Sequence, residues 1–589
     1  MCGIAGIMLS ENLVPQREVL DTLQQALAHR GPDGAKRHVD VGFGLVHTRL
    51  AIIDLKTGDQ PLFGPKGSVL VANGEIYNYI ELKRGLPAET FATNSDCELP
   101  LITYAREGAG FAKPLRGMYA IALADRDAGA LYLARDPFGI KPLYCAEFKD
   151  GILFASELQA LLKTGLVARN ISPKIATELL QLQFTTGEHT IFPAIHRVAP
   201  GETLTLRKGR IAERRRLAAL PEAPPLALSE EEAVVLLESV LKDSVLVHQR
   251  SDVPYGMFLS GGIDSSALLA CMARLNDRPV RAFTAGFPGT DAHDERALAK
   301  EVARAAGAEH IEIEVTKNDF WTTLPEIAGA MDDPAADYAI LPTYLLAREA
   351  ARHVKVVLCG EGGDELFAGY GRYRTALRSR WFGGRQMRHR GFLDDLGVLR
   401  DATGWRHGIE EAEKQIAANK GTRLQHAQAL DCADWLPNDL LLKVDRCLMA
   451  HGLEGRTPFL DQRVAELAFR LPDALKVKGE MGKYILRKWL TRALPAADAF
   501  SRKRGFTVPV AEWIAIRART LGSLIAQSEG IAQVCHRERV EALFHSFGQR
   551  GGKREGAACW QLLFYALWHR IHVEGRSPRA DVMSVLEVQ

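Results

Sequence analysis

No stretch of about 20 consecutive apolar residues occurs in this sequence, and a helix needs that length to cross a membrane. The short apolar run at the amino end has no basic segment before it and is soon followed by Glu11, so no signal peptide is predicted. Internal repeats and low-complexity tracts are also absent. We therefore expect a cytoplasmic protein that has no membrane partner.

The nine cysteines form no recognisable framework. There is no Cys-x-x-Cys pair and no Cys/His cluster with zinc spacing, and the odd count favours reduced thiols in a cytosol. An excess of one charge is also lacking, because 74 Lys and Arg residues balance 72 Asp and Glu residues. The net charge of +2 gives no reason to expect a nucleic-acid partner.

A chain of 589 residues is too long for one hydrophobic core, so several domains are expected. Residues 1 to about 210 contain many short β-rich segments bounded by Gly, Pro and Asp, with helices predicted at 17–28 and 157–162. This pattern favours a layered domain of two sheets with flanking helices. The predicted strands are 44–47, 69–71, 119–123, 131–134 and 152–154.

A break in the pattern follows this first part. Three arginines at 214–216 lead into the proline-rich stretch 221–225, which cannot continue a strand or a helix. Ser229 and Glu232 then form a capping box ahead of an apolar run. We therefore predict an amino-terminal domain, a linker, a second domain and a flexible tail, at 1–212, 213–228, 229–575 and 576–589.

The second domain alternates strands with helices and becomes mostly helical beyond about residue 400. Such alternation predicts a doubly wound parallel sheet, which binds ligands at the carboxyl ends of its strands. One predicted strand ends at 259 and a helix runs through 267–269. Further strands are predicted at 281–284, 311–313 and 354–358, and further helices at 297–306 and 344–351.

Two loops at carboxyl ends of predicted strands carry chemistry. The string Ser-Gly-Gly-Ile-Asp-Ser-Ser at 260–266 offers backbone N–H groups, hydroxyls and a helix amino terminus to an anion, although it is not a Walker A loop. It resembles the loop of enzymes that cleave ATP to AMP and pyrophosphate. Asp264 fits a Mg²⁺ ligand beside phosphates, and Asp364 in the second loop could supply another. Glu361 in that second loop could position an acceptor or move a proton.

Cys2 would combine a nucleophile with a base once Met1 is removed. The thiolate is the attacking species and a free thiol has a pKa of about 8.5. An α-amino group titrates near about 8, so part of it is neutral at pH 7 and can accept the thiol proton. Nucleophiles activated by their own amine are a known catalytic arrangement.

The motif Cys-Gly-Ile at 2–4 has companions that together resemble class II glutamine amidotransferases. They are His-Arg-Gly-Pro-Asp-Gly at 29–34, Arg-Leu-Ala-Ile-Ile-Asp at 49–54 and Asn-Gly-Glu-Ile-Tyr-Asn at 73–78. Joined to the pyrophosphatase loop, they are similar to glutamine-hydrolysing asparagine synthetases over essentially the whole chain. The similarity includes Lys-Val-Asp-Arg at 443–446, Arg-Thr-Pro-Phe-Leu-Asp at 456–461 and Lys-Arg-Gly-Phe at 503–506.

This resemblance implies an α/β and α+β fold: a four-layer αββα Ntn-hydrolase sandwich, then a doubly wound parallel-sheet ATP-pyrophosphatase domain with a helical C-terminal part. In the first site it implies that Cys2 attacks glutamine, Asn73 and Gly74 form the oxyanion hole, Arg49 binds the α-carboxylate, and Glu75 and Asp96 bind the α-ammonium. In the second site it implies an adenine pocket at Leu259 and Ala285, pyrophosphate and magnesium at Ser260, Gly261, Gly262, Asp264 and Ser265, nucleotide contacts at Cys359 and Gly360, and an acceptor site at Glu361 and Lys483. Asp264 and Asp364 are the implied metal ligands.

The implied reaction uses ATP and Mg²⁺. Glutamine hydrolysis at Cys2 supplies ammonia, which displaces AMP from an adenylated aspartate and leaves asparagine. The expected partners are the small molecules glutamine, aspartate and ATP, with no nucleic acid and no membrane, and a homodimer is left open. Cys359 replaces a serine common in the family, Ala285 replaces valine, and Asp-Asp-Pro at 332–334 varies from Asp-Glu-Pro; none of these changes removes a catalytic group.

Several features have a plain structural interpretation. His29 and His47 are predicted to be structural, and the helical stretch 560–568 to pack in a core. Seven arginines and His389 lie between 372 and 390, which favours a solvated or anion-facing surface over a nucleic-acid site, because no interleaved aromatic pattern accompanies them.

Three functions stay open at this point. The first is asparagine synthesis, and the second is amidation of another carboxylate, such as an envelope sugar acid or a peptide, by the same chemistry. The third is a tRNA-modifying ATP pyrophosphatase, which has no use for an amino-terminal glutaminase. A degenerate sensor is disfavoured because Cys2, Asp264 and Asp364 are all present.

Overall fold

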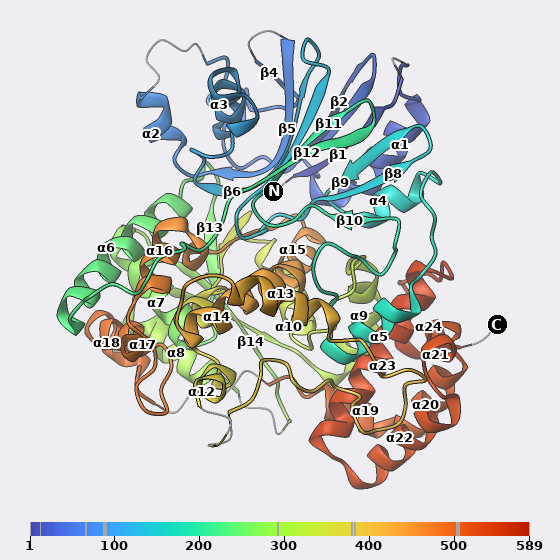
Figure 1. Ribbon diagram of the computed structural model, residues 1–589. Coiled ribbons are helices and arrows are strands. Elements are labelled where there is room, and N and C mark those ends of the chain that lie inside the picture. The colour runs from blue at the N-terminus through green and yellow to red at the C-terminus, as the bar shows by residue number, and fades with distance from the viewer. Residues whose placement is uncertain are drawn as a thin grey trace.

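Figure 1 shows the computed structural model of the chain, with its β layers in blue and cyan above a larger α/β part. The structure describes residues 2–11, 13–64, 67–85, 91–290, 294–378, 381, 384–501 and 507–587. Within these ranges, no helix is both long enough and apolar enough to cross a lipid bilayer.

Two antiparallel sheets form the amino-terminal part. The first contains β1 (Gly3–Leu9), β2 (Gly34–Asp40), β3 (Phe43–Arg49), β8 (Tyr144–Phe148), β9 (Gly151–Ala155) and β10 (His196–Arg197), in the order β10-β8-β9-β1-β3-β2. The second contains β4 (Leu62–Phe63), β5 (Ser68–Ile76), β6 (Gly117–Asp125), β7 (Ala130–Arg135), β11 (Glu202–Arg207) and β12 (Arg210–Arg216), in the order β12-β11-β7-β6-β5-β4. The helices are α1 (Arg17–Ala26), α2 (Tyr79–Arg84), α3 (Leu99–Glu107), α4 (Leu158–Lys163) and α5 (Pro173–Leu182), with short 3-10 turns η1 (Ala28–Arg30), η3 (Asp96–Glu98) and η4 (Gly108–Gly110).

The two sheets pack face to face between helices. Adjacent residues of a strand point to opposite faces, so Ile4 of β1 belongs to the core between the sheets, while Ala5 belongs to the core under α1 and α4. On the other side, Leu101 of α3 packs against Leu70 and Ile121 of the second sheet. The order helix, sheet, sheet, helix confirms the predicted αββα sandwich.

A parallel sheet organises the second part, as predicted. Its strands are β13 (Tyr255–Phe258), β14 (Arg281–Gly286), β15 (Glu309–Glu314), β16 (Val356–Leu358) and β17 (Glu454–Arg456), in the order β15-β14-β13-β16-β17. Helices cover both faces: Ala282 packs toward α6 (Glu230–His248), α7 (Ile263–Leu275), α8 (Arg296–Ala305) and α18 (Tyr484–Ala493). Its neighbour Phe283 packs toward α9 (Lys317–Ala330), α10 (Ile340–Ala350) and α15 (Leu441–Met449).

The rest of the chain is helical, as expected beyond residue 400. Trp560 and Trp568 are buried in α23, where their indole N–H groups donate to the carbonyls of Ala336 at 2.7 Å and Met331 at 2.9 Å, so this stretch packs in a core as predicted. The remaining elements are α11 (Gly363–Leu366), α12 (Gly371–Leu377), α13 (His407–Ala417), α14 (Arg423–Leu430), the π-helix η6 (Asp431–Leu440), η7 (Pro458–Leu460), α16 (Gln462–Arg470), α17 (Asp473–Lys476), η8 (Pro495–Ala497), α19 (Val510–Ile516), α20 (Ala518–Gln527), α21 (Glu529–Val534), α22 (Arg537–Arg550), α23 (Lys553–His572) and α24 (Val582–Leu586).

The ends of two predicted segments differ from the structure. Strand β12 runs to Arg216 instead of ending before a linker that starts at 213. It is an exposed strand at the edge of its sheet, where charged side chains protect the edge from pairing, and Arg214 pairs with Glu202 of β11 at 2.8 Å. The capping box of Ser229 and Glu232 is present at the start of α6.

The structure describes a short helix within the segment 576–589, which was predicted to be a flexible tail. Helix α24 begins after Asp581, whose side chain accepts from two backbone N–H groups. Val582, Val585 and Leu586 are buried in the same core as α23. These three apolar residues lie on one face of the helix, which packs against the core.

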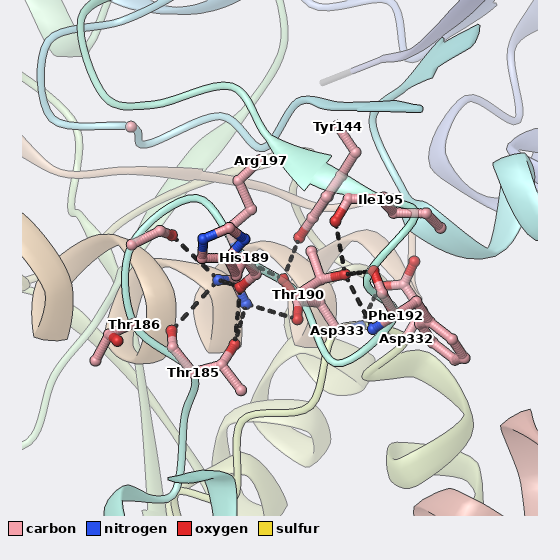
Figure 2. A network of polar contacts seen from close by, with 12 residues as sticks. Tyr144, Thr185, Thr186, His189, Thr190, Phe192, Ile195, Arg197, Asp332 and Asp333 are labelled. Atoms are coloured by element: carbon pink, nitrogen blue, oxygen red, sulfur yellow. Dashed lines mark hydrogen bonds and ion pairs between the residues drawn. The ribbon is translucent and has the colours of Figure 1, made fainter. Parts of the chain in front are cut away.

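A buried polar network joins the two parts of the chain (Figure 2). The Arg197 guanidinium of β10 donates to both carboxylate oxygens of Asp333, at 2.7 and 2.8 Å, and Tyr144 of β8 donates to the same carboxylate at 2.9 Å. All three side chains are buried. Breaking such a pair would leave a buried charge uncompensated, so the network holds the parts in one relative position.

Candidate functional site

Cys2 lies at the start of β1, at the edge of the sandwich that faces the second part of the chain. Its side chain is buried, and its backbone N–H donates to Oδ1 of Asn73 at 3.0 Å. The thiol is 3.9 Å from the carbonyl oxygen of Leu50. Burial raises the pKa of the Cys2 thiol, so forming the thiolate requires a nearby proton acceptor.

Asn73 and Gly74, the residues that the resemblance implies for the oxyanion hole, lie on β5, and Asn73 contacts Cys2. Because Asn73 uses Oδ1 to accept from Cys2, its amide Nδ2 points elsewhere, and this buried donor has no partner among the described residues. A donor in this state is poised for an oxyanion. At Gly74 a Cβ would come within 2.1 Å of the Met118 carbonyl oxygen on β6, so only glycine fits.

Three further charged residues predicted to bind glutamine lie around this strand. Arg49 is nearly buried and pairs with Asp59 at 2.6 Å. Glu75 and Asp96 are buried, and burial raises the pKa of both, that of Asp96 to about 6. An α-ammonium group would supply the positive charge that stabilises their ionised forms.

The second part of the chain completes this first site, which sequence reasoning missed. Arg456 of β17 lies 3.1 Å from Glu75, and its Nε donates to Glu454 at 2.6 Å. Arg30 donates to the Cys2 carbonyl at 3.2 Å and forms two bonds to Asp445 of α15, at 2.8 and 2.9 Å. The motifs at 443–446 and 456–461 are part of the family resemblance, but no sequence rule assigns them to the site around Cys2 in the other part of the chain.

Arg30 therefore links the carbonyl of the proposed nucleophile to the second part. Burial alone would lower the pKa of Arg30, but the carboxylates of Asp445 and Glu157 outweigh it and raise this pKa. Glu157 also accepts from Arg30 at 2.8 Å. The cation is fully buried and its geometry depends on both carboxylates.

We expect Asp445→Asn to lower the free energy of unfolding by about 3 kcal/mol, because it removes one partner of a buried ion pair. The hydrolysis of glutamine should fall as well, since Arg30 would no longer be held against Cys2. Urea denaturation and glutamate release measure the two effects. The control is Glu309→Gln, which breaks the exposed pair with Arg281 at 2.9 Å and should change neither. Equal stability and hydrolysis in Asp445→Asn would contradict this role.

The predicted phosphate loop follows β13 and leads into α7. Ser260 and Ser265 hydroxyls lie 3.2 Å apart, and the Gly262 N–H donates to Ser260 at 3.3 Å. Gly261 has a φ of +70°, which a residue with a side chain rarely adopts. Gly262 caps a helix of 13 residues, so its amino terminus and the hydroxyls face one space that suits an anion.

Lys483 connects the two carboxylates predicted to bind metal. Its Nζ lies 2.7 Å from Asp364 and also pairs with Asp264, and the side chain is 2% exposed. Burial would lower the pKa of Lys483, but the two carboxylates outweigh it and raise this pKa. Asp264 and Asp364 lie 100 positions apart and follow parallel strands whose carboxyl ends share one edge of the sheet, whereas Lys483 begins α18 and was expected here only from the resemblance.

The remaining predicted residues surround this pair. Burial raises the pKa of Glu361, and its Oε2 is buried with no hydrogen-bond partner among the described residues. A side chain at Gly360 would meet Cβ of Asp264 at 3.2 Å, so the two loops are in contact. Leu259, Ala285 and Cys359 are buried at carboxyl ends of β13, β14 and β16.

The candidate metal ligands at this site are the carboxylates of Asp264 and Asp364. No group of three or more His, Cys, Asp or Glu side chains with metal geometry occurs in the described ranges. Two carboxylates that converge on one cation do fit Mg²⁺, which takes few carboxylates and completes its shell with phosphate oxygens and water.

His29 and His47 were predicted to have structural roles. His29 lies 3.0 Å from Glu157, and His47 is buried, where burial lowers its pKa to about 3 and keeps it neutral. Neither is near enough to Cys2 to hydrogen bond with its thiol in the described contacts, which agrees with a structural role. The motif at 503–506 lies outside the described residues.

Comparison with known proteins assigns both parts. Residues 236–570 match the asparagine synthase family, which is more than half of the chain, and residues 1–216 match the glutamine amidotransferase domain family.

Curated relatives cover the chain from end to end. This chain is 34% identical to asparagine synthetase [glutamine-hydrolyzing] 1 of Bacillus subtilis, over 98% of each chain. It is 30% identical to asparagine synthetase B [glutamine-hydrolyzing] of Escherichia coli, over 87% of this chain and 83% of the relative. It is also 29% identical to a protein named amidase chyE of Penicillium rubens, over 83% and 86%.

Proposed function

Because the chain belongs to the asparagine synthase family, we propose that it hydrolyses glutamine at one site and uses the ammonia to convert aspartate to asparagine at the other. The family uses ATP, so aspartate would be activated by adenylation. The same two sites would serve amidation of another carboxylate, and the acceptor is therefore the part that experiment must decide.

At the first site, the Cys2 sulfur attacks the side-chain amide of glutamine. A C–S bond forms, the C–N bond breaks, and ammonia leaves with the proton taken from the thiol. Water then hydrolyses the thioester to glutamate and restores Cys2. The buried Nδ2 of Asn73, which lacks a protein partner in the described contacts, is the donor that would stabilise the oxyanion in both steps.

At the second site, a carboxylate oxygen of the acceptor attacks the α-phosphorus of ATP, and pyrophosphate leaves. The hydroxyls of Ser260 and Ser265 and the amino end of α7 would bind pyrophosphate, while Lys483 offsets its developing charge. Asp264 and Asp364 would hold Mg²⁺, which neutralises phosphate charge when it is bound.

Ammonia then attacks the acyl carbon, the C–O bond to AMP breaks, and the amide forms. The attacking nitrogen must lose a proton as AMP leaves. Glu361 is suited to accept it, because its carboxyl lies beside Asp264 and has an unpaired buried oxygen among the described residues.

One observation carries the proposal: a single chain holds both a buried cysteine bonded to Asn73, whose amide Nδ2 has no partner among the described residues, and a lysine shared by two carboxylates at the end of a parallel sheet. The first arrangement is used for acyl transfer and the second for phosphate chemistry. A protein that only modified RNA would need the second alone.

The acceptor can be identified by incubating the purified protein with ATP, Mg²⁺, glutamine and a panel of carboxylates. We expect aspartate to stimulate pyrophosphate release with formation of asparagine, and sugar acids and acidic peptides to give none. The assay measures pyrophosphate and identifies the amide by mass. Stimulation by another carboxylate in place of aspartate would reassign the acceptor, and no stimulation by any carboxylate would reject the proposed reaction.

A further inference from the structure

A cavity of about 370 Å³ lies apart from the residues assigned to either site. It is formed by the end of α5, helix α12, the segment 385–392 and Trp435 of the π-helix η6. This volume is within the range of small-molecule sites, which is about 300–1,000 Å³. Its charged lining residues are all basic in the described part of the chain: Arg372, Arg385, Arg388, His389 and Arg390.

The arginines of this basic cavity outnumber their carboxylate partners. Arg372 and Arg388 share the one buried carboxylate of Asp431, at 2.8 and 3.0 Å. Arg390 pairs at 2.7 Å with Asp395, and both of these side chains are more than half exposed. Arg385 forms no ion pair with the described residues. The four guanidinium groups therefore have two carboxylate partners, and among the described residues no carboxylate lines the cavity itself.

Other acidic groups near the cavity are already occupied by amide donors. Asp394 accepts from Gln181 at 2.8 Å and from the N–H of Gly391 at 2.9 Å. Asp434 accepts from the N–H of Gly187 at 2.7 Å. These carboxylates keep their negative charge, but neither lines the cavity and neither forms an ion pair with its arginines among the described residues, so the ionisable groups that face the cavity are the basic ones.

Aromatic stacking holds the guanidinium groups in place. The guanidinium carbon of Arg388 lies 4.1 Å from the Trp435 ring centroid, and that of Arg372 lies 5.2 Å from it. The Trp435 Nε1 donor is buried and has no hydrogen-bond partner in the described ranges. Stacked arginines present a fixed planar fork that matches carboxylate and phosphate geometry.

The wall of the cavity is in contact with the ATP-site loop. Arg372 also stacks on Tyr370 at 3.8 Å, and the Tyr370 hydroxyl donates to Glu365, the residue after Asp364, at 2.7 Å. A side chain at Gly369 would meet Asp364 at 1.8 Å and Lys483 at 2.2 Å, so this loop packs directly on the charged pair. An anion in the cavity would thus lie one loop away from the proposed acceptor site.

We propose that this cavity binds an anionic group, a phosphate or a carboxylate, of a small effector that is separate from the substrates. Of the seven arginines between 372 and 390, four line this cavity: Arg372, Arg385, Arg388 and Arg390. Binding of the anion does not depend on the proposed function.

Binding is tested with inorganic phosphate as the probe, by calorimetry on the full chain at constant ionic strength. A non-hydrolysable ATP analogue with Mg²⁺ fills the ATP site first. The variant is Arg385→Gln with Arg390→Gln, because these two side chains have no buried partner and their loss should not unfold the protein. Arg352→Gln with Arg281→Gln is the matched surface control. We expect at least about tenfold weaker binding in the cavity variant and no change in the control.

Phosphate affinity that is equal in the wild type and the cavity variant, or undetectable in the wild type, would overturn the proposal. Kinetics then assign the source. If the bound anion belonged to a substrate instead, the cavity variant would raise KM for aspartate or ATP in the absence of phosphate, and this result would contradict an effector site. If it is an effector, phosphate changes the aspartate-dependent rate of the wild type and not that of the variant. Failure of aspartate to react would reject the proposed function without affecting the binding result.

Discussion

Replacing Cys2 by alanine is expected to abolish glutamine-dependent amide synthesis while synthesis from ammonium salts continues. The loss should reach at least about 10⁴-fold, because no other nucleophile can replace the thiol in that site. The nearest candidate is Cys97, whose thiol lies 3.7 Å from the Gly74 carbonyl and is buried, and burial raises its pKa well above the ordinary value. Its thiolate is therefore unavailable at neutral pH.

Synthesis from ammonium should persist because the ATP site contains no atom of Cys2. Its described charged groups come from the loops after β13 and β16 and from the start of α18. Assays of glutamate release, and of pyrophosphate release with either nitrogen source, separate the two activities. Cys2→Ser is the matched control: it keeps the buried volume and the backbone bond to Asn73, and it should also lose glutamine use. If ammonium-dependent synthesis disappeared with either variant, the two sites would not be separable.

The architecture was predictable because local patterns agree with it. The alternation of strands and helices after 255, the Gly-rich turn at 260–262 and the capping box at Ser229 each have a short-range physical cause. Parallel strands end at one edge, so Asp264 and Asp364 could be placed together before any coordinates existed. The four-layer sandwich depended on the resemblance, since short alternating strands alone do not specify how two sheets pack.

What sequence reasoning missed are buried charges that form pairs over long distances. Strand β17 consists of Glu-Gly-Arg, and a strand with two charged residues of three is not predicted to be buried. It is buried because Arg456 pairs with Glu75 and Glu454. Ion pairs of this kind form only in the folded chain, and no spacing rule reveals them.

Helix α9 was missed for another reason: it contains Pro325, which lowers the expected helix propensity.

Lys483→Met is expected to remove synthesis from both nitrogen sources while glutamine hydrolysis continues. The loss of one positive group that faces developing phosphate charge should slow the reaction by about 10²–10³-fold. Methionine fills most of the volume but carries no charge, so Asp264 and Asp364 would face each other without their shared cation. Arginine should not restore activity, because the backbone of Gly369 packs closely on the Lys483 side chain. A Cβ added to Gly369 would lie only 2.2 Å from the Lys483 Cε, so a broader guanidinium group has no room there.

The matched control lies on the same helix, α18. Lys488 pairs with Glu230 at 2.9 Å at the surface, and Lys488→Met should leave both activities unchanged. Pyrophosphate release with aspartate and ammonium measures the synthetase reaction, and glutamate release measures the other site. Normal pyrophosphate release by Lys483→Met would show that this lysine only balances the two carboxylates. Loss of glutamate release in addition would mean that the charged pair at the end of the parallel sheet also supports the glutamine site, through the contacts that α15 and β17 make with the sandwich.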